Sequence, residues 1–318
     1  MNEITVLPSG TLTSSVPAGE RLYRAFIESQ TENTRAAYVR DLSAFAVFLG
    51  EASPIAAIRR LLSAAGGEGN AMLLDYRTHM VGAKLASSTI NRRLSAIRSA
   101  AKLARTLGYT SWTPEISGLK AQAYRDTRGP GISGTRDMLE IAVSHSHPAI
   151  ALRDVALIRL MFDLALRRKE CVGLDLGDVD FPGRRVWIVG KGKTEKEART
   201  LPDKTASALA KWIDARAAHA NAECEALFIS LSGNSSGKRL SGRGVHWIVA
   251  GVGADAGIKT RPHGLRHASI TAALDANNGD VRAAQQHARH ANPQTTMRYD
   301  DNRRDLAGRV AESIAALI

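Results

Sequence analysis

The sequence contains few cysteines and no long apolar segment. Cys171 and Cys224 are the only thiols among 318 residues, and neither has a CxxC partner. Two cysteines exclude a disulfide framework and a four-cysteine zinc site, so both are expected to be packing residues. No apolar run approaches the roughly 20 residues that span a bilayer. The first 18 residues lack the basic start and apolar core of a signal peptide. We therefore expect a cytoplasmic protein without a membrane-spanning segment.

Acidic residues are also scarce relative to basic ones. The chain has 43 lysines and arginines against 31 aspartates and glutamates, which gives a formal net charge of +12. Such a balance favours a polyanionic partner, although ribosomal and membrane-surface proteins share it. The composition is otherwise that of a globular protein, with 44% hydrophobic residues. A chain of this length accommodates two ordinary domains.

Two amphipathic helices are expected in the first third of the chain. Residues 31–49 place apolar side chains at helical spacing before Gly50, and residues 87–108 do the same and end at Gly108. The second segment contains five basic residues and no acidic one. This imbalance favours a helix that faces phosphates over an ordinary solvated face. The basic residues are Arg92, Arg93, Arg98, Lys102 and Arg105.

The helical pattern stops between residues 115 and 133, where a basic stretch contains Gly-Pro-Gly and is typical of a linker. We expect a disordered lead-in over 1–18, a helical domain over 19–114, this linker, and a second domain over 134–318. The second domain should be mainly helical with one small β-sheet. Its expected elements are a buried helix over 147–166, a strand-turn-strand over 184–202, and helices over 205–219, 241–257, 263–279 and 280–290.

Tyrosine is nearly absent from the second domain. Of the six tyrosines in the chain, only Tyr299 lies beyond residue 124. It closes the last of four short segments that carry reactive side chains. These segments are ALRRKE with Arg167 and Glu170, GKGKT with Lys191, HGLRH with His263 and Arg266, and HARHANPQTTMRY with His290 and Tyr299. Each has an ordinary structural explanation by itself, since Arg167 could pair with Asp163 or Glu170 and Tyr299 could belong to the core.

Two other interpretations of these segments are weaker. A phosphate-binding P-loop that ended at Thr194 would need a glycine at position 187, where the chain has Trp187. His263 and His267 have the spacing of a zinc-protease pair, but Gly264 replaces the glutamate that follows the first histidine in such proteases. A metal site that also used His287 and His290 stays open as a minor alternative.

In combination, the four segments resemble the catalytic domain of the tyrosine recombinases, the phage-integrase and Xer-like family. The matching residues are Arg167, Lys191, His263, Arg266, His290 and Tyr299, with Glu170 as a supporting residue, and they occur in the family's order. The helices expected near residues 31–49 and 87–108 likewise resemble the family's SAM-like core-binding domain. The resemblance therefore runs from about residue 20 to the C-terminus.

The resemblance implies a chemistry that explains these residue types. Tyr299 would attack a DNA phosphodiester and form a covalent 3′-phosphotyrosine, and two arginines would bind the charged oxygens of the phosphorus centre. The histidines would bind the same oxygens or manage the tyrosine proton. Lys191 would protonate the leaving 5′ oxygen. The family needs no ATP, metal or other cofactor.

Three departures from the family pattern are visible. Ala165 replaces a glycine before Leu-Arg, and Ala288-Arg289 replaces the usual Leu-Gly before the second histidine. The lysine hairpin is also longer than usual, which leaves Lys193 and Lys196 as rival proton donors.

The resemblance also implies partners and assemblies. These are double-stranded DNA with inverted-repeat half-sites, a homotetramer that works through a Holliday junction, a monomer or weak oligomer when free, a location on the nucleoid, and an origin in a mobile element. Leu306, Val310, Ile314 and Leu317 form an apolar stripe on the last helix, which could pack in its own domain or in a neighbouring subunit. A type IB topoisomerase and a catalytically idle DNA-binding regulator are the alternatives.

Overall fold

The chain divides into two compact units, one up to Tyr124 and one from Arg125. The computed structural model describes residues 18–64, 66–120, 129–190, 192–297, 299 and 306–317. The expected lead-in therefore lies almost entirely outside the described residues, as does the middle of the expected linker. The two units are described separately below.

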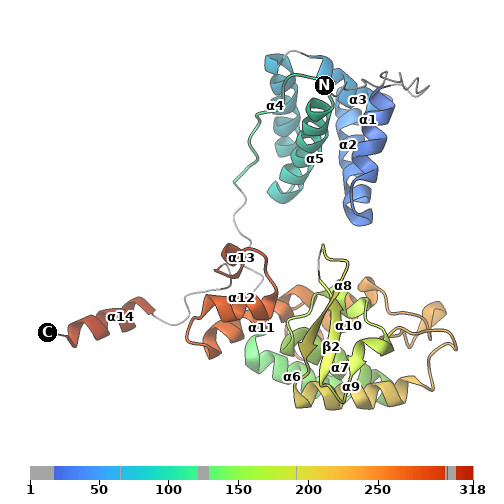
Figure 1. Ribbon diagram of the computed structural model, residues 1–318, viewed down its shortest axis with the longest axis vertical. Coiled ribbons are helices and arrows are strands. Elements are labelled where there is room, and N and C mark those ends of the chain that lie inside the picture. The colour runs from blue at the N-terminus through green and yellow to red at the C-terminus, as the bar shows by residue number, and fades with distance from the viewer. Residues whose placement is uncertain are drawn as a thin grey trace, which may run out of the picture. The chain divides into compact units, whose positions relative to one another are not determined.

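The N-terminal unit is a small all-helical bundle (Figure 1). Its helices are α1 (Ala18–Glu28), α2 (Glu32–Leu49), α3 (Pro54–Ser63), α4 (Gly66–Gly82) and α5 (Ser87–Thr106). They surround one hydrophobic core, in which Phe45, Tyr76 and Ile97 are almost fully buried. Burial of one stripe from each helix supplies most of the stability of such a bundle.

The two helices expected in this unit are present. α2 ends at Gly50, whose backbone φ of +68° is the left-handed conformation that glycine adopts most easily. α5 buries Ile90, Leu94 and Ile97 on one face, and its N-cap is Ala86 rather than either following serine. α1, α3 and α4 were not identified in the sequence.

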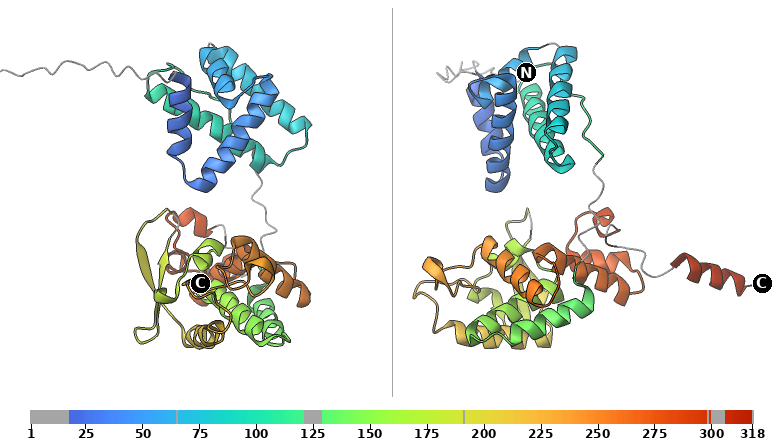
Figure 2. Two further views of the ribbon diagram at one scale, coloured as in Figure 1. Left: turned by 90° about the vertical axis from the view of Figure 1, so that its right-hand side faces the viewer. Right: turned by 180° about the vertical axis from the view of Figure 1, so that it is seen from behind.

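The C-terminal unit is mainly helical and contains a small sheet, as expected (Figures 1 and 2). Its core surrounds α7, which packs against the helices α6, α9 and α11. Cys171 is fully buried in this core and Cys224 packs against it, in keeping with their expected packing role. The helices are α6 (Gly131–Val143), α7 (Pro148–Asp163), α8 (Arg168–Val172), α9 (Asp203–Arg216), α10 (Gly242–Asp255), α11 (Pro262–Ala276), α12 (Val281–Ala288), α13 (Pro293–Met297) and α14 (Leu306–Ala315).

The sheet consists of three antiparallel strands in the order β1, β2, β3. β1 (Val179–Asp180) pairs with β2 (Arg185–Val189), which pairs with β3 (Lys196–Thr200) along its whole length. Val186 and Ile188 face the core while their neighbours along β2 are exposed, the alternation expected of a sheet with one buried face. The hairpin runs along one edge of the unit (Figure 2). Of the lysines singled out in the sequence, Lys193 lies in its turn and Lys196 begins β3.

In the described parts of the chain, no single helix is long and apolar enough to cross a membrane. One sharply bent pair, Thr34–Leu49 with Pro54–Ser63, meets the length and composition criteria together.

Candidate active site

The site begins at the tight connection between α7 and α8. α7 ends at Asp163, and the chain turns through Ala165, whose φ is +49°. Arg167 then caps α8, and its backbone N–H donates to Glu170 Oε2 at 2.7 Å. Its guanidinium Nη1 donates to Oε1 of the same carboxylate at 2.8 Å. Of the two partners considered for Arg167, the structure has Glu170, while Asp163 pairs with Arg159.

Arg266 ties this connection to the end of α12. It lies on α11 with 3% of its surface exposed, and its two terminal nitrogens donate to the backbone oxygens of Ala165 and Ala288. Burial lowers the pKa of Arg266 to about 10, and the neighbouring charge of Arg167 acts in the same direction. It remains charged at neutral pH and concentrates positive charge at this position.

His263 begins the same helix one turn before Arg266. It is exposed, and its pKa is lowered by partial removal from water and by the positive charges of Arg266, Arg261 and Arg167. The imidazole is therefore neutral at neutral pH and can accept or donate a hydrogen bond.

Tyr299 lies between two histidine rings. Its ring centroid is 5.5 Å from that of His290, with the ring planes 27° apart, and 4.7 Å from that of His267. Thr271 donates from its hydroxyl to the Tyr299 backbone oxygen at 3.4 Å, and His290 Nδ1 hydrogen-bonds to the Thr296 hydroxyl at 2.9 Å. These contacts hold the tyrosine and His290 in a fixed mutual arrangement.

The Tyr299 side chain belongs to the interior of its own unit. Its exposed fraction is 8%, and it packs in a small apolar cluster beside Arg167 and Arg266, which together form the arginine centre of the site. The buried members of this cluster are Ala165, Ile270, Leu274, Ala284, Ala288 and Tyr299. Tyr299 is thus packed as a core residue and adjoins the polar site at the same time.

Among the histidines of the site, His290 has the most strongly shifted pKa. Its pKa is lowered to about 4, mainly by burial and then by the charges of Arg266 and Arg167. Since a group with this pKa is neutral at neutral pH, His290 can act as a proton acceptor.

The lysines of the hairpin separate into different surroundings. Lys191 lies outside the described residues. Lys193 Nζ lies 2.8 Å from Glu197 Oε2, and both residues line a cavity of about 680 Å³ together with Arg167 and His290. Lys196 pairs instead with Asp178, and this hydrogen bond raises its pKa. Of the two rivals to Lys191, only Lys193 lines this cavity.

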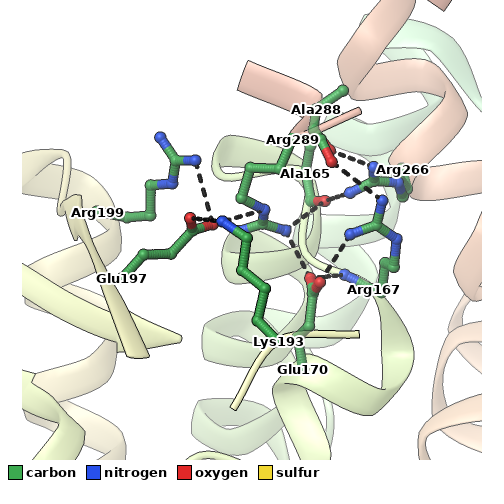
Figure 3. Close-up of polar contacts among 9 residues, drawn as sticks. All are labelled: Ala165, Arg167, Glu170, Lys193, Glu197, Arg199, Arg266, Ala288 and Arg289. Atoms are coloured by element: carbon green, nitrogen blue, oxygen red, sulfur yellow. Dashed lines mark hydrogen bonds and ion pairs between the residues drawn. The ribbon is translucent and has the colours of Figure 1, made fainter. Parts of the chain in front are cut away.

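Arg289 is a polar residue of the site that the sequence did not assign, although its unusual place before His290 was noted. Its guanidinium lies among Ala165, Glu170 and Glu197, between Arg167 and the hairpin (Figure 3). The sequence carried a signal for this residue, because an arginine stands where the family usually has glycine. The sequence did not show that the Arg289 side chain points inward.

The histidines considered for a metal site have other contacts. His287 hydrogen-bonds to the Ser269 hydroxyl at 2.9 Å, and the His267 ring contacts that of Tyr299 at an interplanar angle of 47°. Within the described residues, no group of three histidine, cysteine, aspartate or glutamate side chains could hold a metal ion.

The basic residues of α5 are only partly free. Arg92 pairs with the buried Asp41 of α2 at 2.5 Å, and Arg98 donates to the Ile116 backbone oxygen at 3.1 Å. The acidic partner absent from the helix itself therefore comes from another helix. Lys102 and Arg105 are exposed and line a shallow pocket.

Comparison with known proteins identifies the family of the chain. Residues 135–305 match the phage integrase family, and residues 22–106 match its N-terminal SAM-like domain. The chain is 37% identical to tyrosine recombinase slr0733 of Synechocystis sp. over 92% of this chain and 93% of that protein. It is 31% identical to tyrosine recombinase XerC of Salmonella typhi over 68% of this chain and 69% of XerC. The chain belongs to the phage integrase family and is an enzyme of the tyrosine recombinase class.

Solved structures share its fold at low sequence identity. The Tn1549 transposon integrase in complex with transposon right end DNA gives a TM-score of 0.68 at 16% identity, over 93% of this chain and 98% of that one. XerH bound to palindromic difH substrate gives 0.64 at 16% identity, over 92% and 93% of the two chains. These similarities confirm the predicted fold, a helical SAM-like domain followed by a mixed catalytic domain.

Proposed function

We propose that this enzyme is a site-specific DNA recombinase that cuts and rejoins strands through Tyr299. One observation carries the proposal. Tyr299 lies between His267 and His290, next to Arg266, which fastens α11 to both the Arg167 connection and the end of α12. A tyrosine, a neutral imidazole and two arginines in one place suit attack on a phosphodiester. The DNA complexes of structurally similar integrases support the substrate class.

In the cleavage step, the Tyr299 oxygen forms a bond to phosphorus and the bond between phosphorus and the 5′ oxygen breaks. The product is a 3′-phosphotyrosine and a free 5′ hydroxyl. Negative charge builds on the nonbridging oxygens, where Arg167 and Arg266 would bind it. Each guanidinium has five N–H donors. Arg266 uses two of them on the backbone oxygens of Ala165 and Ala288. Arg167 uses one on Glu170 and one, at 3.5 Å, on the Arg289 backbone oxygen. The remaining donors are available for the phosphate.

Two proton transfers accompany this step. His290 is neutral because of its lowered pKa and would accept the Tyr299 proton, directly or through water. A hairpin lysine would protonate the leaving 5′ oxygen. Lys191 holds this role by family resemblance, and Lys193 is the alternative whose position in the cavity supports it.

Strand exchange would use four protomers on paired inverted-repeat sites and proceed through a Holliday junction. The burial of Tyr299 in its own unit supports cleavage in cis, in which each protomer uses its own tyrosine. Ile314 on α14 is 56% exposed, and Leu317, two residues after its end, is 85% exposed, which supports packing of this segment against a neighbouring protomer. The phosphotyrosine conserves the bond energy, so a second DNA end can attack it and restore the strand.

The N-terminal unit would add electrostatic binding to the DNA backbone. Lys102 and Arg105 are the strongest candidates on α5 because both are exposed. Arg92, Arg93 and Arg98 would contribute the charge left after their contacts inside the unit. Such contacts position the protein on DNA and do not read the sequence.

The first test is capture of the covalent intermediate. Protein incubated with fragmented host DNA is denatured and recovered, and the attached 3′ ends are sequenced. The recovered sequence is then built into a nicked substrate that traps the adduct. Wild type should form the adduct, Tyr299→Phe should form none, and Tyr109→Phe, which changes an exposed tyrosine of the other unit, should match wild type.

The outcomes separate the alternatives. Holliday junctions from two intact sites support recombination. Adducts and relaxation on any supercoiled plasmid, without junctions, indicate a type IB topoisomerase. Binding without any adduct from wild type indicates a DNA-binding regulator.

A further inference from the structure

Arg289 occupies a backbone position that disfavours it. It follows α12 and precedes His290, and its φ of +54° lies in the left-handed region. Glycine adopts this conformation without steric cost, whereas a residue with a Cβ does not. An arginine that keeps such a backbone requires compensation from its side chain.

The side chain of Arg289 turns inward and is 5% exposed. Its Nη2 donates to Glu170 Oε2 at 2.5 Å, and the same nitrogen lies 3.4 Å from the Ala165 backbone oxygen. Its Nε lies 3.8 Å from Glu197 Oε1. Arg289 therefore contacts one carboxylate beneath Arg167 and another on β3 of the hairpin (Figure 3).

The first of these contacts changes the charge available at the site. Glu170 holds Arg167 by two hydrogen bonds, and a one-to-one pair would cancel the Arg167 charge. Arg289 binds the same carboxylate, so two positive charges face one negative charge. Arg167 is then held in place while the cluster keeps a net positive charge for a phosphate.

The second contact reaches the hairpin. Glu197 binds Lys193 at 2.8 Å and Arg199 at 3.3 Å, both within the hairpin. Glu197 also forms a longer ion pair with Arg289, and this pair joins the hairpin to the end of α12. The Nε and Nη1 donors of Arg289 have no hydrogen-bond partner, which is costly for buried groups. A small inward movement of the hairpin would satisfy Nε through Glu197.

We propose that Arg289 is a positioning residue that fastens the β2–β3 hairpin to the arginine centre by bridging Glu170 and Glu197. The proposal deepens the recombinase function proposed above and rests on it. Closure of the hairpin shortens the contact between Arg289 and Glu197 and brings the hairpin lysine to the leaving 5′ oxygen. Arg289 acts through Arg167 and the lysine and does not itself transfer a proton.

The test compares Arg289→Gln, Arg289→Lys and Glu197→Gln. Neither substitution at position 289 introduces glycine, so the backbone strain at this position is kept. Hydrogen exchange is measured for the amides of β2 and β3 in the DNA-free full chain. Arg289→Gln and Glu197→Gln should each speed exchange there by about tenfold, a typical loss for one partly buried ion pair. Glu197→Gln also removes the pairs with Lys193 and Arg199, so the double variant should exchange no faster than Glu197→Gln alone, because Arg289 acts on the hairpin through Glu197. Arg289→Lys should restore part of the protection.

The second readout is cleavage of the trapping substrate at saturating DNA. Arg289→Gln should slow adduct formation about tenfold or more while the DNA dissociation constant changes far less, as expected of a group that orients reacting residues. Arg282→Gln is the matched control, because it removes a charge that lines the same cavity but bridges neither carboxylate. It should leave hairpin exchange unchanged.

Unchanged hairpin exchange in Arg289→Gln would overturn the proposal, as would additive effects of Arg289→Gln and Glu197→Gln. Weakened DNA binding with an unchanged cleavage rate would also overturn it and would mark Arg289 as a direct phosphate ligand. If Arg289→Gln speeds hairpin exchange but the wild-type protein forms no adduct with DNA, the attachment of the hairpin by Arg289 is supported and the recombinase function is refuted. The two failures are thus distinguishable.

Discussion

Ala165 and Arg289 show at the residue scale how the site is shaped by its backbone. Both stand where glycine is usual in the family, and both keep a positive φ. The turn at Ala165 and the end of α12 at Ala288 present the backbone oxygens that Arg266 binds. At both positions a residue with a side chain adopts the left-handed conformation that suits glycine. Ala165 adds only a methyl group to the cluster around Tyr299, whereas Arg289 adds a charge.

The pKa of His290 gives the residue-scale prediction. In DNA-free protein, the imidazole should titrate at about 4 instead of its ordinary 6.5, because burial and three arginines oppose its charge. A bound phosphate offsets those arginines, so DNA should raise this pKa. Titration of the histidine ring signals by NMR tests this, with His290→Gln identifying the signal. A pKa near 6.5 without DNA would contradict the prediction.

The same shift affects stability in a defined direction. As the pH falls from 6.5 to about 4, the unfolded chain binds a proton at His290 before the folded chain does. The free energy of unfolding therefore decreases as the pH falls through this window, and His290→Gln should make that decrease smaller. Urea unfolding at both ends of the window measures it.

At the scale of elements, α5 combines a structural role with an exposed basic surface. Asp41 of α2 is 2% exposed, and Arg92 is its nearest charged partner, with Arg93 at 3.9 Å. A buried carboxylate needs such a partner. The helix therefore uses part of its charge to hold the bundle together, and Lys102 and Arg105 stay exposed.

Two single substitutions should separate these roles. Arg92→Ala should lower the free energy of unfolding by about 2 kcal/mol, because Asp41 is left poorly paired. Arg105→Ala should change that energy by less than about 0.5 kcal/mol. It should also weaken DNA binding and reduce the salt dependence by about one phosphate contact. Chemical unfolding and DNA titrations at several salt concentrations measure both. Equal effects of the two substitutions on stability would refute the distinction.

The β2–β3 hairpin packs on the core through one strand and contacts Arg289 through the other. Its alternation of buried and exposed residues places it on the edge of the core, with Val186 and Ile188 inward. Glu197 on β3 forms the ion pair between the described part of the hairpin and Arg289, and the proposed attachment rests on it. An element anchored by few contacts can move without unfolding the core.

At the scale of the whole molecule, the two units have separate hydrophobic cores that share no residue. Domains with their own cores can unfold independently. The chain carries a formal charge of +12. Under the proposed function both units bind the DNA backbone, and each would contribute to the salt dependence.

Calorimetry of the full chain should therefore show two unfolding transitions. Ile97→Ala should lower the midpoint of one and Leu209→Ala that of the other, since each removes a fully buried side chain from one core. Each substitution should cost about 3 kcal/mol in its own transition. A single transition shifted by both substitutions would show that the units unfold together.

Much of the fold could be predicted from the sequence because its signals are local. The helices around residues 31–49 and 87–108 were found through apolar residues at helical spacing, and the hairpin through two short strands on either side of a charged turn. α4 was missed because it begins with four residues that include three glycines, although Tyr76 and Met80 lie on its buried face. α6 begins at Gly131, where Gly-Pro-Gly had indicated a linker.

The sequence by itself determined the fold class, the enzyme family and a set of candidate catalytic residues, because transfer of a phosphoryl group restricts which side chains can take part. Their roles remain predictions. Only the tertiary structure decided which charges meet. Asp41 reaches Arg92, and Glu170 is shared by Arg167 and Arg289, across separations of 51 and 119 residues. Such pairs depend on packing between distant helices, which no local pattern records. The same packing decided that Tyr299 is buried in its own unit.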